Sequence, residues 1–333
     1  MFELQSFAGI LYIGDPHVSS KRPGRRKDDY LSSVLGKLAF CAQVCNEQNL
    51  LPVIGGDLLH RADENSLRAL NQLIAVLKSF HTTPVSLEGN HDKLETSLSE
   101  GDALYLLEQS GAVKVISSFG QFGEYLIGGN HVRLIGIPYG CTIPNSLPAG
   151  EGIAVAFTHH DLAFGGAYPG AIALKEIEGA SMVINGHMHD NKPSVPMGGT
   201  VWHNPGNIEP LSVDLAHFVP RAWRWDGDAS APLQGIELPH GTDIWDLTGV
   251  RVDAADADQA VSAYLQTVPN PSRFAKILVE QKVQETDAQR TEDVSGLKED
   301  LRQVCEAGQM SDAAQQLLNS LFASLQAEVL QSA

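Results

Sequence analysis

The chain has 333 residues, 43% of them hydrophobic and 19% charged, and its formal net charge is −17. This composition is typical of a globular protein with room for one large domain and a smaller one, and no apolar run approaches the roughly 20 residues that a membrane span needs. The negative charge is unfavourable for general nucleic-acid binding, which relies on Lys and Arg. Any contact with phosphates should therefore involve the basic cluster at residues 21–27.

The four cysteines form no zinc-binding pattern. Cys41 and Cys45 lie four residues apart on a predicted helix with no second Cys or His pair nearby, which favours two small core residues over a metal site. Unpaired cysteines are typical of a reducing compartment. The first fourteen residues also lack the basic start of a signal peptide. We therefore expect a cytoplasmic protein without a membrane partner.

From residue 8 to about 205 the pattern alternates between helices and strands. Apolar residues at helical spacing predict helices over 28–49, 66–80 and 102–110. Short apolar runs predict strands over 10–13, 51–54, 84–87, 113–116, 125–127, 132–137, 153–157, 182–184 and 201–203. This order favours an α/β sandwich, in which ligands bind beyond the carboxyl ends of the strands.

The last third of the sequence has a different pattern. Residues 226–240 are rich in Gly, Pro and Asp and are predicted to be a connector. A second unit follows, with a strand over 249–252, a helix over 256–266 and a strand over 274–280. Two helices, at about 295–307 and 311–330, come last. Their apolar face either packs on its own domain or docks a partner, and the pattern favours neither.

Five short polar motifs come in a fixed order, each at the end of an apolar stretch. They read Asp15-Pro16-His17, Gly56-Asp57, Gly89-Asn90-His91-Asp92, His159-His160 and Gly186-His187-Met188-His189. Asp, Asn and His side chains are ligands of divalent metals. Because the motifs occupy the strand ends at which open α/β sheets bind ligands, we predict a two-metal hydrolytic centre.

The spacing within the motifs indicates individual roles. Asp57 follows a strand and a Gly pair that leaves room for close approach, so it is the candidate for a carboxylate that bridges both ions. Asn90 offers a neutral oxygen, which suits Mn²⁺ or Mg²⁺. His91 is adjacent to Asn90 and is better placed as a general acid or transition-state stabiliser, with Asp92 orienting its ring.

The order D-x-H, G-D, G-N-H-D, H, G-H-x-H resembles that of the calcineurin-like metallophosphoesterases over about residues 10–205. The resemblance implies a four-layer αββα sandwich with a small C-terminal α+β capping domain and terminal helices. It implies ion ligands that share Asp57, namely Asp15, His17, Asp57 and His189 for one ion, and Asp57, Asn90, His159 and His187 for the other. His159 is preferred to His160 because it directly follows the predicted strand.

Further residues resemble one branch of this family, the SbcD-like double-strand-break-repair nucleases. Residues 56–60 with Asn65-Ser66 resemble the second motif of that branch. Residues 204–208 resemble its Pro-Gly-Ser turn, with Asn207 in place of Ser and Pro210 where an Arg is common. The unit at 249–280 is similar to the DNA-capping domain. The implied organisation is a nuclease domain over 1–225, a capping domain over 241–285 and a helical partner-binding segment over 295–333.

Five side chains near the motifs are candidates for contacting substrate. Arg25, Arg26 and Lys27 leave the site directly after the first motif, and His60 and Arg61 directly follow the second. Basic side chains in such positions contact phosphates in nucleic-acid enzymes. For each of the five, the alternative is a solvated surface position.

The resemblance implies a DNA nuclease that hydrolyses phosphodiester bonds with two divalent ions, Mn²⁺ first, with Mg²⁺, Fe²⁺ or Zn²⁺ as alternatives. An SbcC-type SMC-like ATPase would bind the C-terminal helices, and a homodimer is compatible with this branch. Exonucleolytic and endonucleolytic cleavage both stay open. The alternative is a metallophosphoesterase for another substrate, a cyclic nucleotide or a phosphoprotein, which the acidic charge and Arg61 favour. A non-catalytic scaffold is less consistent, because no ligand of the pattern is missing.

Overall fold

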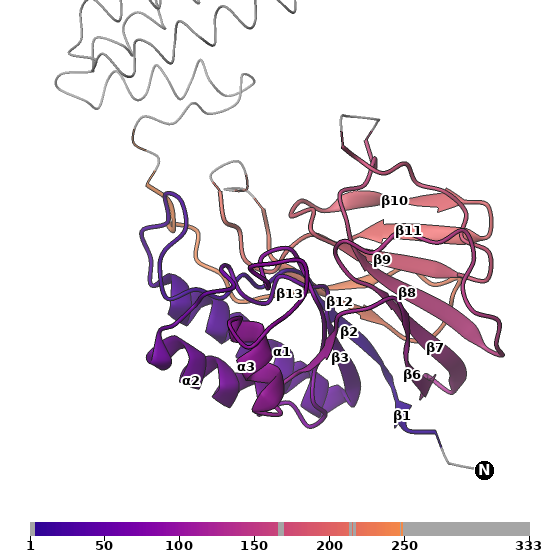
Figure 1. The fold of residues 1–333 in the computed structure, drawn as a ribbon, viewed down its shortest axis with the longest axis horizontal. Coiled ribbons are helices and arrows are strands. Elements are labelled where there is room, and N and C mark those ends of the chain that lie inside the picture. Colours follow the sequence, from indigo (N-terminus) through magenta and orange to yellow (C-terminus); the bar gives the residue numbers. More distant parts are fainter. Residues whose placement is uncertain (1–3, 166–169, 213–214, 216–217, 247, 249–333) are drawn as a thin grey trace, which may run out of the picture. The chain divides into compact units, whose positions relative to one another are not determined.

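The computed structural model describes residues 4–165, 170–212, 215, 218–246 and 248 (Figure 1). The predicted unit at 249–280 and the two helices at 295–307 and 311–330 lie outside the described residues. The capping domain of 241–285 also lies outside them from residue 249 onward. The domain boundaries 1–225, 241–285 and 295–333 therefore stay predictions.

Two mixed β-sheets form the centre of the described structure. The six-stranded sheet has the order β13 (Gln234–Glu237), β12 (Arg221–Trp225), β2 (Gly9–Ile13), β3 (Leu50–Ile54), β4 (Val85–Leu87) and β5 (Lys114–Ile116). The seven-stranded sheet has the order β1 (Ser6–Phe7), β6 (Gly120–Ile127), β7 (Asn130–Ile137), β8 (Ile153–His159), β9 (Met182–Gly186), β11 (Thr200–Asn204) and β10 (Lys192–Met197). Strands β2 to β5 run parallel, and so do β7 to β9.

The two sheets pack face to face through a buried apolar layer. Alternate residues of the central strands point into it, including Ile10 and Tyr12 of β2 and Val155 and Phe157 of β8. The rings of Tyr12 and Phe157 stack with centroids 6.2 Å apart. This packing brings the carboxyl ends of β2, β3 and β4 close to those of β8 and β9, where the polar motifs follow.

Three helices cover the outer face of the six-stranded sheet: α1 (Tyr30–Gln48), α2 (Leu67–Leu77) and α3 (Ala103–Gln109) (Figure 1). Helix α1 begins where the Asp29 carboxylate accepts the Ser32 amide at 3.2 Å. It ends at Asn49, whose φ of 51° is left-handed, a conformation that Asn tolerates. Ser66 caps α2 in the same way, accepting the Ala69 amide at 3.3 Å.

The outer face of the seven-stranded sheet carries no helix in the part of the chain that the structure describes. Loop residues cover it instead, and Ile143, Leu147 and Ile177 pack against the outward side chains of β7, β8 and β9. Pro144, Pro148 and several glycines in these loops interrupt any helical run. The α/β class with two mixed sheets is confirmed, and within the described residues loops stand where the predicted αββα sandwich has its fourth, helical layer.

Every helix and strand predicted within the described residues is present, with ends shifted by a few residues. Strands β1, β10, β12 and β13 were not predicted. Strand β10 contains Pro193 and Pro196 and lies at a sheet edge, where a missing amide hydrogen is tolerated. Strand β13 lies within the predicted connector 226–240 and pairs antiparallel with β12, so residues 234–237 belong to the sheet.

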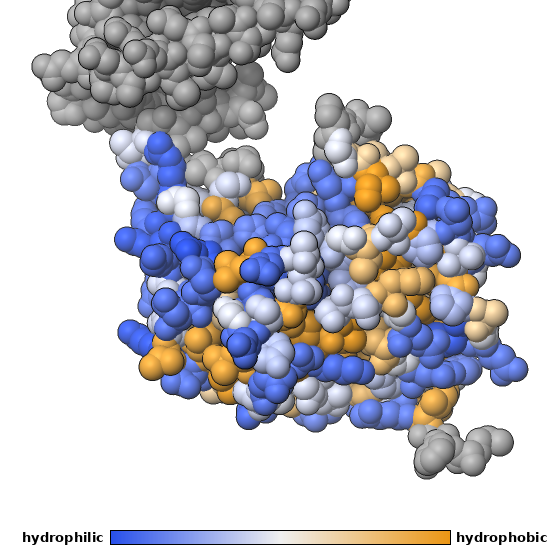
Figure 2. Space-filling view, viewed as in Figure 1, coloured by the Kyte–Doolittle hydropathy of each residue, from blue (hydrophilic) through white to orange (hydrophobic). Residues whose placement is uncertain are grey.

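The helical side of the surface mixes hydrophilic and hydrophobic residues. Figure 2 shows hydrophobic residues scattered singly among hydrophilic ones over the helices, and Leu67 and Leu106 are among the exposed apolar side chains. Isolated apolar residues of this kind are normal on a protein surface. Among the described residues, no helix is both long and apolar enough to cross a lipid bilayer.

Candidate metal centre

All five motifs lie at the carboxyl ends of strands from both sheets. Asp15 and His17 follow β2, Asp57 follows β3, and Asn90 follows β4. From the other sheet, His159 is the last residue of β8, while His187 and His189 follow β9. The site is therefore formed where the ends of the two sheets meet, as expected for ligand binding in α/β folds.

Backbone hydrogen bonds hold the first two motifs side by side. The His17 amide donates to the Asp57 carbonyl at 2.9 Å, and the Val18 amide donates to the Leu58 carbonyl at 2.9 Å. The Tyr30 hydroxyl of α1 donates to the His17 carbonyl at 2.8 Å. Helix α1 and the loop after β3 thus fix the position of the His17 ring.

Two glycines allow the ligand loops to approach each other. Gly56 has a φ of 112°, and a Cβ there would lie 2.4 Å from Nδ1 of His159. A Cβ on Gly89 would lie 2.1 Å from Oδ1 of Asp57. Any side chain at either position would push a ligand out of place, which gives a physical reason for glycine in both motifs.

The first group of ligand atoms centres on His17. Its Nε2 lies 2.9 Å from Nε2 of His189 and 3.6 Å from Oδ2 of Asp57. Burial lowers the pKa of His17 well below its usual value, and burial also lowers the pKa of His189, to about 4. Both rings are therefore neutral at pH 7, which is the form that binds metals.

The second group centres on His159. Its Nδ1 donates to the Gly55 carbonyl at 2.9 Å, so in the neutral ring Nε2 carries the lone pair. Nε2 lies 3.2 Å from Oδ1 of Asn90 and 3.3 Å from Oδ2 of Asp57, and Nδ1 of His187 lies 2.9 Å from the same Asn90 oxygen. Asp57 thus belongs to both groups.

These atoms fit a pair of divalent cations. The lone pairs of Asn90, Asp57 and neutral His159 face one another, an arrangement that is repulsive unless a proton or a metal ion lies between them. Both carboxylate oxygens of Asp15 are buried without a well-formed hydrogen bond, and Asp15 lies 3.8 Å from His159. Asp57, His159 and His187 form one cluster whose ligand atoms lie within 4.8 Å. A second cluster, His17, His60 and His91, shares only His17 with the predicted ligands.

The electrostatics of the site attract positive charge. Burial alone would lower the pKa of His159, but the adjacent Asp57 carboxylate raises it to about 9. Burial alone would raise the pKa of Asp57, and His159 and His17 nevertheless hold it well below its usual range. Without a metal, His159 therefore holds a proton at neutral pH, in a place where a cation is favourable.

The backbone at the site is strained. Among the described non-glycine residues, positive φ occurs at Asn49, at Asp15 (31°), at His17 and Asp57 (48° each) and at His187 (73°). Asn49 ends a helix, but the other four are all predicted ligands. Each such residue costs roughly 1–3 kcal/mol, so the fold tolerates this strain where the ligands must converge.

His91 lies beside both groups. Its Nδ1 donates to the His60 carbonyl at 2.8 Å and its amide donates to Oδ1 of Asp57 at 2.8 Å. Since Nδ1 is engaged, Nε2 is the nitrogen that can exchange a proton with substrate. The His91 ring lies 4.9 Å from that of His17, and the His60 ring stacks on it at 5.6 Å.

The sequence predicted that Asp92 orients the His91 ring, and the structure corrects this prediction. Its Oδ1 accepts the Leu59 amide at 3.1 Å and its Oδ2 accepts the Gly89 amide at 3.0 Å. Its side chain is fully buried, and burial followed by the charge of Asp57 raises its pKa to about 7. Asp92 therefore joins the loops after β3 and β4, and the His60 carbonyl orients His91.

The basic segment contributes less to the site than its sequence suggested. The Arg26 side chain has 0% exposure, and its guanidinium donates to Asp28, Glu209, the Pro210 carbonyl and Ser33. All five donors are used, so none is free for a phosphate. The prediction that Arg26 contacts substrate is corrected: Arg26 belongs to a buried ion-pair network.

The other basic candidates are more accessible. Arg25 donates to the Thr248 carbonyl at 2.6 Å, and Lys27 pairs with Asp243 at 2.5 Å. Arg61 is 56% exposed and pairs with Asp63 at 2.8 Å. These three keep a surface position from which substrate contact stays a prediction.

We expect Arg26→Met to destabilise the fold without weakening substrate binding. Glu209 is buried, and Lys37 alone would remain to pair with it, at 2.7 Å. Breaking a buried ion pair costs about 3–5 kcal/mol in free energy of unfolding, and Lys37 should hold the loss to about 3 kcal/mol. Urea denaturation measures this loss, with Arg25→Met as the matched control. A raised KM for a phosphodiester substrate at unchanged stability would instead support substrate contact.

Several residues near the site carry no sequence signal. Asn185 Oδ1 accepts from Thr158 at 2.7 Å and from the His160 amide at 3.1 Å, which ties the end of β8 to that of β9. The Tyr139 ring lies 5.9 Å from that of His187. Both residues stand outside the polar motifs, so only the structure brings them to the site. His160 turns away and contacts the Cys141 carbonyl at 2.7 Å, which favours His159 as the ligand.

The affinity for Mn²⁺ should fall as the pH is lowered. Burial raises the pKa of Asp15 to about 7, and the pKa of His159 is raised to about 9, where the Asp57 charge outweighs burial. A metal must displace one proton below about pH 9 and a second below about pH 7. Each displaced proton lowers the apparent affinity about 10-fold per pH unit.

Calorimetric titration of the metal-free chain with Mn²⁺ from about pH 8 to about pH 6 measures this slope. Asp15→Asn should bind more weakly at every pH but with a shallower slope in the lower half of this range. A flat affinity profile across the range would contradict the proton competition.

A comparison with known protein families agrees with this geometry. A family model described as "Calcineurin-like phosphoesterase" matches residues 9–191, more than half of the chain. No curated protein matches the chain. A hypothetical protein from Thermus thermophilus has a crystal structure that is similar with a TM-score of 0.39 and 14% identity, covering 69% of this chain and 100% of that one.

A 5′-nucleotidase precursor, also from Thermus thermophilus, is similar with a TM-score of 0.40 and 13% identity, covering 78% of this chain and 58% of that one. Values this low do not transfer a substrate from either structure.

Proposed function

Because this chain belongs to the calcineurin-like phosphoesterase family, we propose that it is a metal-dependent DNA nuclease of the SbcD-like kind. The observation that supports a metal-dependent hydrolase is that predicted metal ligands from both sheets lie next to Asp57. Oδ2 of Asp57 lies 3.6 Å from Nε2 of His17 and 3.3 Å from Nε2 of His159, so one carboxylate oxygen is close to both groups of ligand atoms. Asp57 is thus placed to bridge two ions.

The proposed ligands follow the two groups, and Asp15 is assigned to the first by the resemblance to the family. Asp15, His17, Asp57 and His189 would hold one ion, and Asp57, Asn90, His159 and His187 the other. When bound, two divalent ions supply an activated water and offset the charge on phosphate oxygens. We take Mn²⁺ as the first choice, because the set combines imidazoles with an amide oxygen. Metal analysis should then find two ions per chain.

His91 would act on the leaving group. As the attacking oxygen bonds to phosphorus, the bond from phosphorus to the 3′ oxygen breaks, and that oxygen needs a proton or a hydrogen bond. Nε2 of His91 is the nitrogen left for this role, since Nδ1 donates to the His60 carbonyl at 2.8 Å.

The proposal of DNA as substrate rests on the resemblance of residues 204–208 to the SbcD-like turn. The Asn204 amide group donates to the Met188 carbonyl at 2.9 Å and to the Asp190 carbonyl at 2.8 Å, and the Asn207 amide donates to the His189 carbonyl at 3.0 Å. The turn thus packs directly on the loop of the last metal motif. An SbcC-type ATPase bound to residues 295–333, a homodimer and a cytoplasmic location belong to the same proposal.

A substrate panel tests the proposal. The purified chain with Mn²⁺ should degrade linear single- or double-stranded DNA, and circular DNA separates exonuclease from endonuclease activity. A chromogenic phosphodiester, a cyclic nucleotide and a phosphopeptide complete the panel. Hydrolysis of the chromogenic diester with no cleavage of any DNA, with or without an SbcC-type ATPase, would refute the nuclease and retain the phosphoesterase.

The alternative is a phosphoesterase for cyclic nucleotides or phosphoproteins. The acidic net charge of −17 favours it. The position of Arg61 in the sequence also favoured it, but the structure weakens this argument. The Arg61 guanidinium pairs with Asp63 at 2.8 Å, and the side chain is 56% exposed. Faster turnover of a cyclic nucleotide or a phosphopeptide than of DNA would decide for this alternative.

A further inference from the structure

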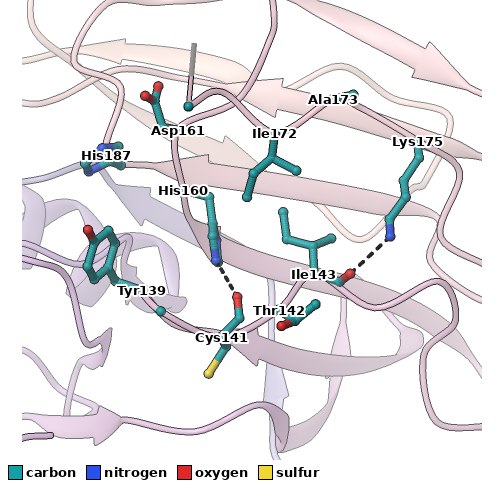
Figure 3. A pocket seen from close by; sticks show the side chains of 12 residues that line it. Tyr139, Cys141, Thr142, Ile143, His160, Asp161, Ile172, Ala173, Lys175 and His187 are labelled. Carbon is teal, nitrogen blue, oxygen red and sulfur yellow. Dashed lines mark hydrogen bonds between the residues drawn. The ribbon is translucent and has the colours of Figure 1, made fainter. Parts of the chain in front are cut away.

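A pocket of about 740 Å³ opens beside the candidate metal centre (Figure 3). His187 and Tyr139 lie at one end of its lining and Lys175 lies at the other. Pockets of this volume hold small organic molecules or one segment of a larger one. The pocket is therefore placed to receive a group that is covalently attached to the phosphate at the metal centre.

Two exposed apolar side chains line this pocket. Tyr139 and Ile172 are each 39% exposed and are among the few large apolar residues that face solvent in the described chain. The Tyr139 ring is tilted by 33° to that of His187, 5.9 Å away. An exposed aromatic ring beside a phosphate site provides a surface on which a nucleobase can stack.

Lys175 supplies a fixed positive charge at the far end. Its Nζ donates to the Ile143 carbonyl at 3.1 Å and to Oδ1 of Asn145 at 2.6 Å (Figure 3 draws the first). Its backbone carbonyl accepts the indole hydrogen of the buried Trp202 at 2.8 Å. The ammonium group is thus held in place from both ends of the residue.

The charge of Lys175 is not neutralised within the described part of the chain. Both acceptors of its Nζ are neutral, and none of the ion pairs among the described residues involves Lys175. An ammonium group has three hydrogens, so one remains for a ligand. Because Lys175 lies opposite His187 in the pocket, it is positioned for a second anionic group, not for the scissile phosphate.

We propose that this pocket binds the nucleotide next to the scissile bond and that Lys175 binds a second phosphate, at the far end of that nucleotide. This inference rests on the proposed function and makes the site specific for a nucleotide with phosphates on both sides. Tyr139 and Ile172 bound its base, and Lys175 reads its terminal phosphate. Terminal phosphates on DNA ends and free nucleoside bisphosphates share this chemistry.

The decisive test is a direct binding measurement. Thymidine 3′,5′-bisphosphate, thymidine 5′-phosphate and thymidine 3′-phosphate are titrated calorimetrically into the full-length chain loaded with Mn²⁺. We expect the bisphosphate to bind about 10-fold tighter than the better monophosphate, the effect of one hydrogen-bonded charge pair, and Lys175→Met should reduce this ratio to about 1. Lys114→Met is the matched control, because Lys114 also donates to a backbone carbonyl, that of Phe122 at 3.0 Å, outside the pocket.

A second arm separates the two sources of the phosphate. Oligonucleotides with a phosphate or a hydroxyl at the 5′ end, and likewise at the 3′ end, are compared for KM. A preference for one phosphorylated end that Lys175→Met removes identifies DNA ends as the ligand. A bisphosphate advantage without any end preference identifies free nucleotides.

Equal binding of bisphosphate and monophosphates by the wild-type chain would overturn the inference, as would a bisphosphate advantage that survives in Lys175→Met. If the wild type cleaves no DNA, the nuclease proposal fails by itself, and the calorimetric ratio still decides the role of the pocket.

Discussion

Asp57→Asn should abolish hydrolysis and remove tight metal binding. The Asp57 carboxylate lies within 3.6 Å of His17 and 3.3 Å of His159 and accepts the His91 amide at 2.8 Å. The amide of Asn cannot bridge two cations, and without the negative charge it no longer offsets their mutual repulsion. We expect activity on a chromogenic diester to fall by at least about 1000-fold, beyond the roughly 10–100-fold typical of residues that only orient ligands.

Metal content by mass spectrometry and diester hydrolysis measure this effect together. Asp63→Asn is the matched control, because Asp63 lies further along the same loop but pairs with the exposed Arg61. If Asp57→Asn keeps two ions per chain and more than about a tenth of the activity, Asp57 is not the bridging ligand.

His91→Asn should impair catalysis and leave metal binding intact. General acid–base groups contribute about 10²–10⁴-fold to rate, and His91 is adjacent to the proposed ligands without being one of them. Nδ1 is held by the His60 carbonyl at 2.8 Å, which leaves Nε2 to act on the leaving oxygen. An interaction that is made only in the transition state affects kcat more than KM. His81→Asn is the control, since His81 is an exposed histidine that contacts Asn46.

The choice of substrate separates the two roles left open for His91. A nitrophenolate departs without a proton, whereas a 3′ oxygen of DNA does not. If His91 is a general acid, His91→Asn should slow DNA cleavage much more than nitrophenyl diester cleavage. A transition-state stabiliser would slow both equally. Full activity on both substrates would rule out any role in catalysis.

The sequence predicted which side chains converge better than it predicted the contacts that surround them. Asp15, Asp57 and His159 could be placed because each comes directly after an apolar run, and strand ends of an α/β sheet converge. The role of Arg26 could not be predicted, because its partner Glu209 lies 183 positions away in the sequence. A run of basic residues gives no sign of which side chain is buried.

The local sequence pattern also gave wrong predictions where contacts with the backbone determine the structure. Asp92 follows His91 directly, which suggested a carboxylate–histidine pair, yet its oxygens accept backbone amides of Leu59 and Gly89. Strand β10 carries prolines that single-sequence rules exclude from central strands, and its place at an edge makes them harmless. For Asp92, one of the two partners, Leu59, lies in another segment of the chain.

The origin of the donors in two different sheets has a consequence for the life of the protein. Asp57 follows a strand of the six-stranded sheet and His159 ends a strand of the seven-stranded sheet, so a bound ion would link the two sheets. A ligand that binds only the folded state raises its apparent stability by mass action. Depletion of divalent metals would then lower the stability of the fold as well as the hydrolytic activity. Chains without bound ions would unfold more often and be degraded faster by proteases.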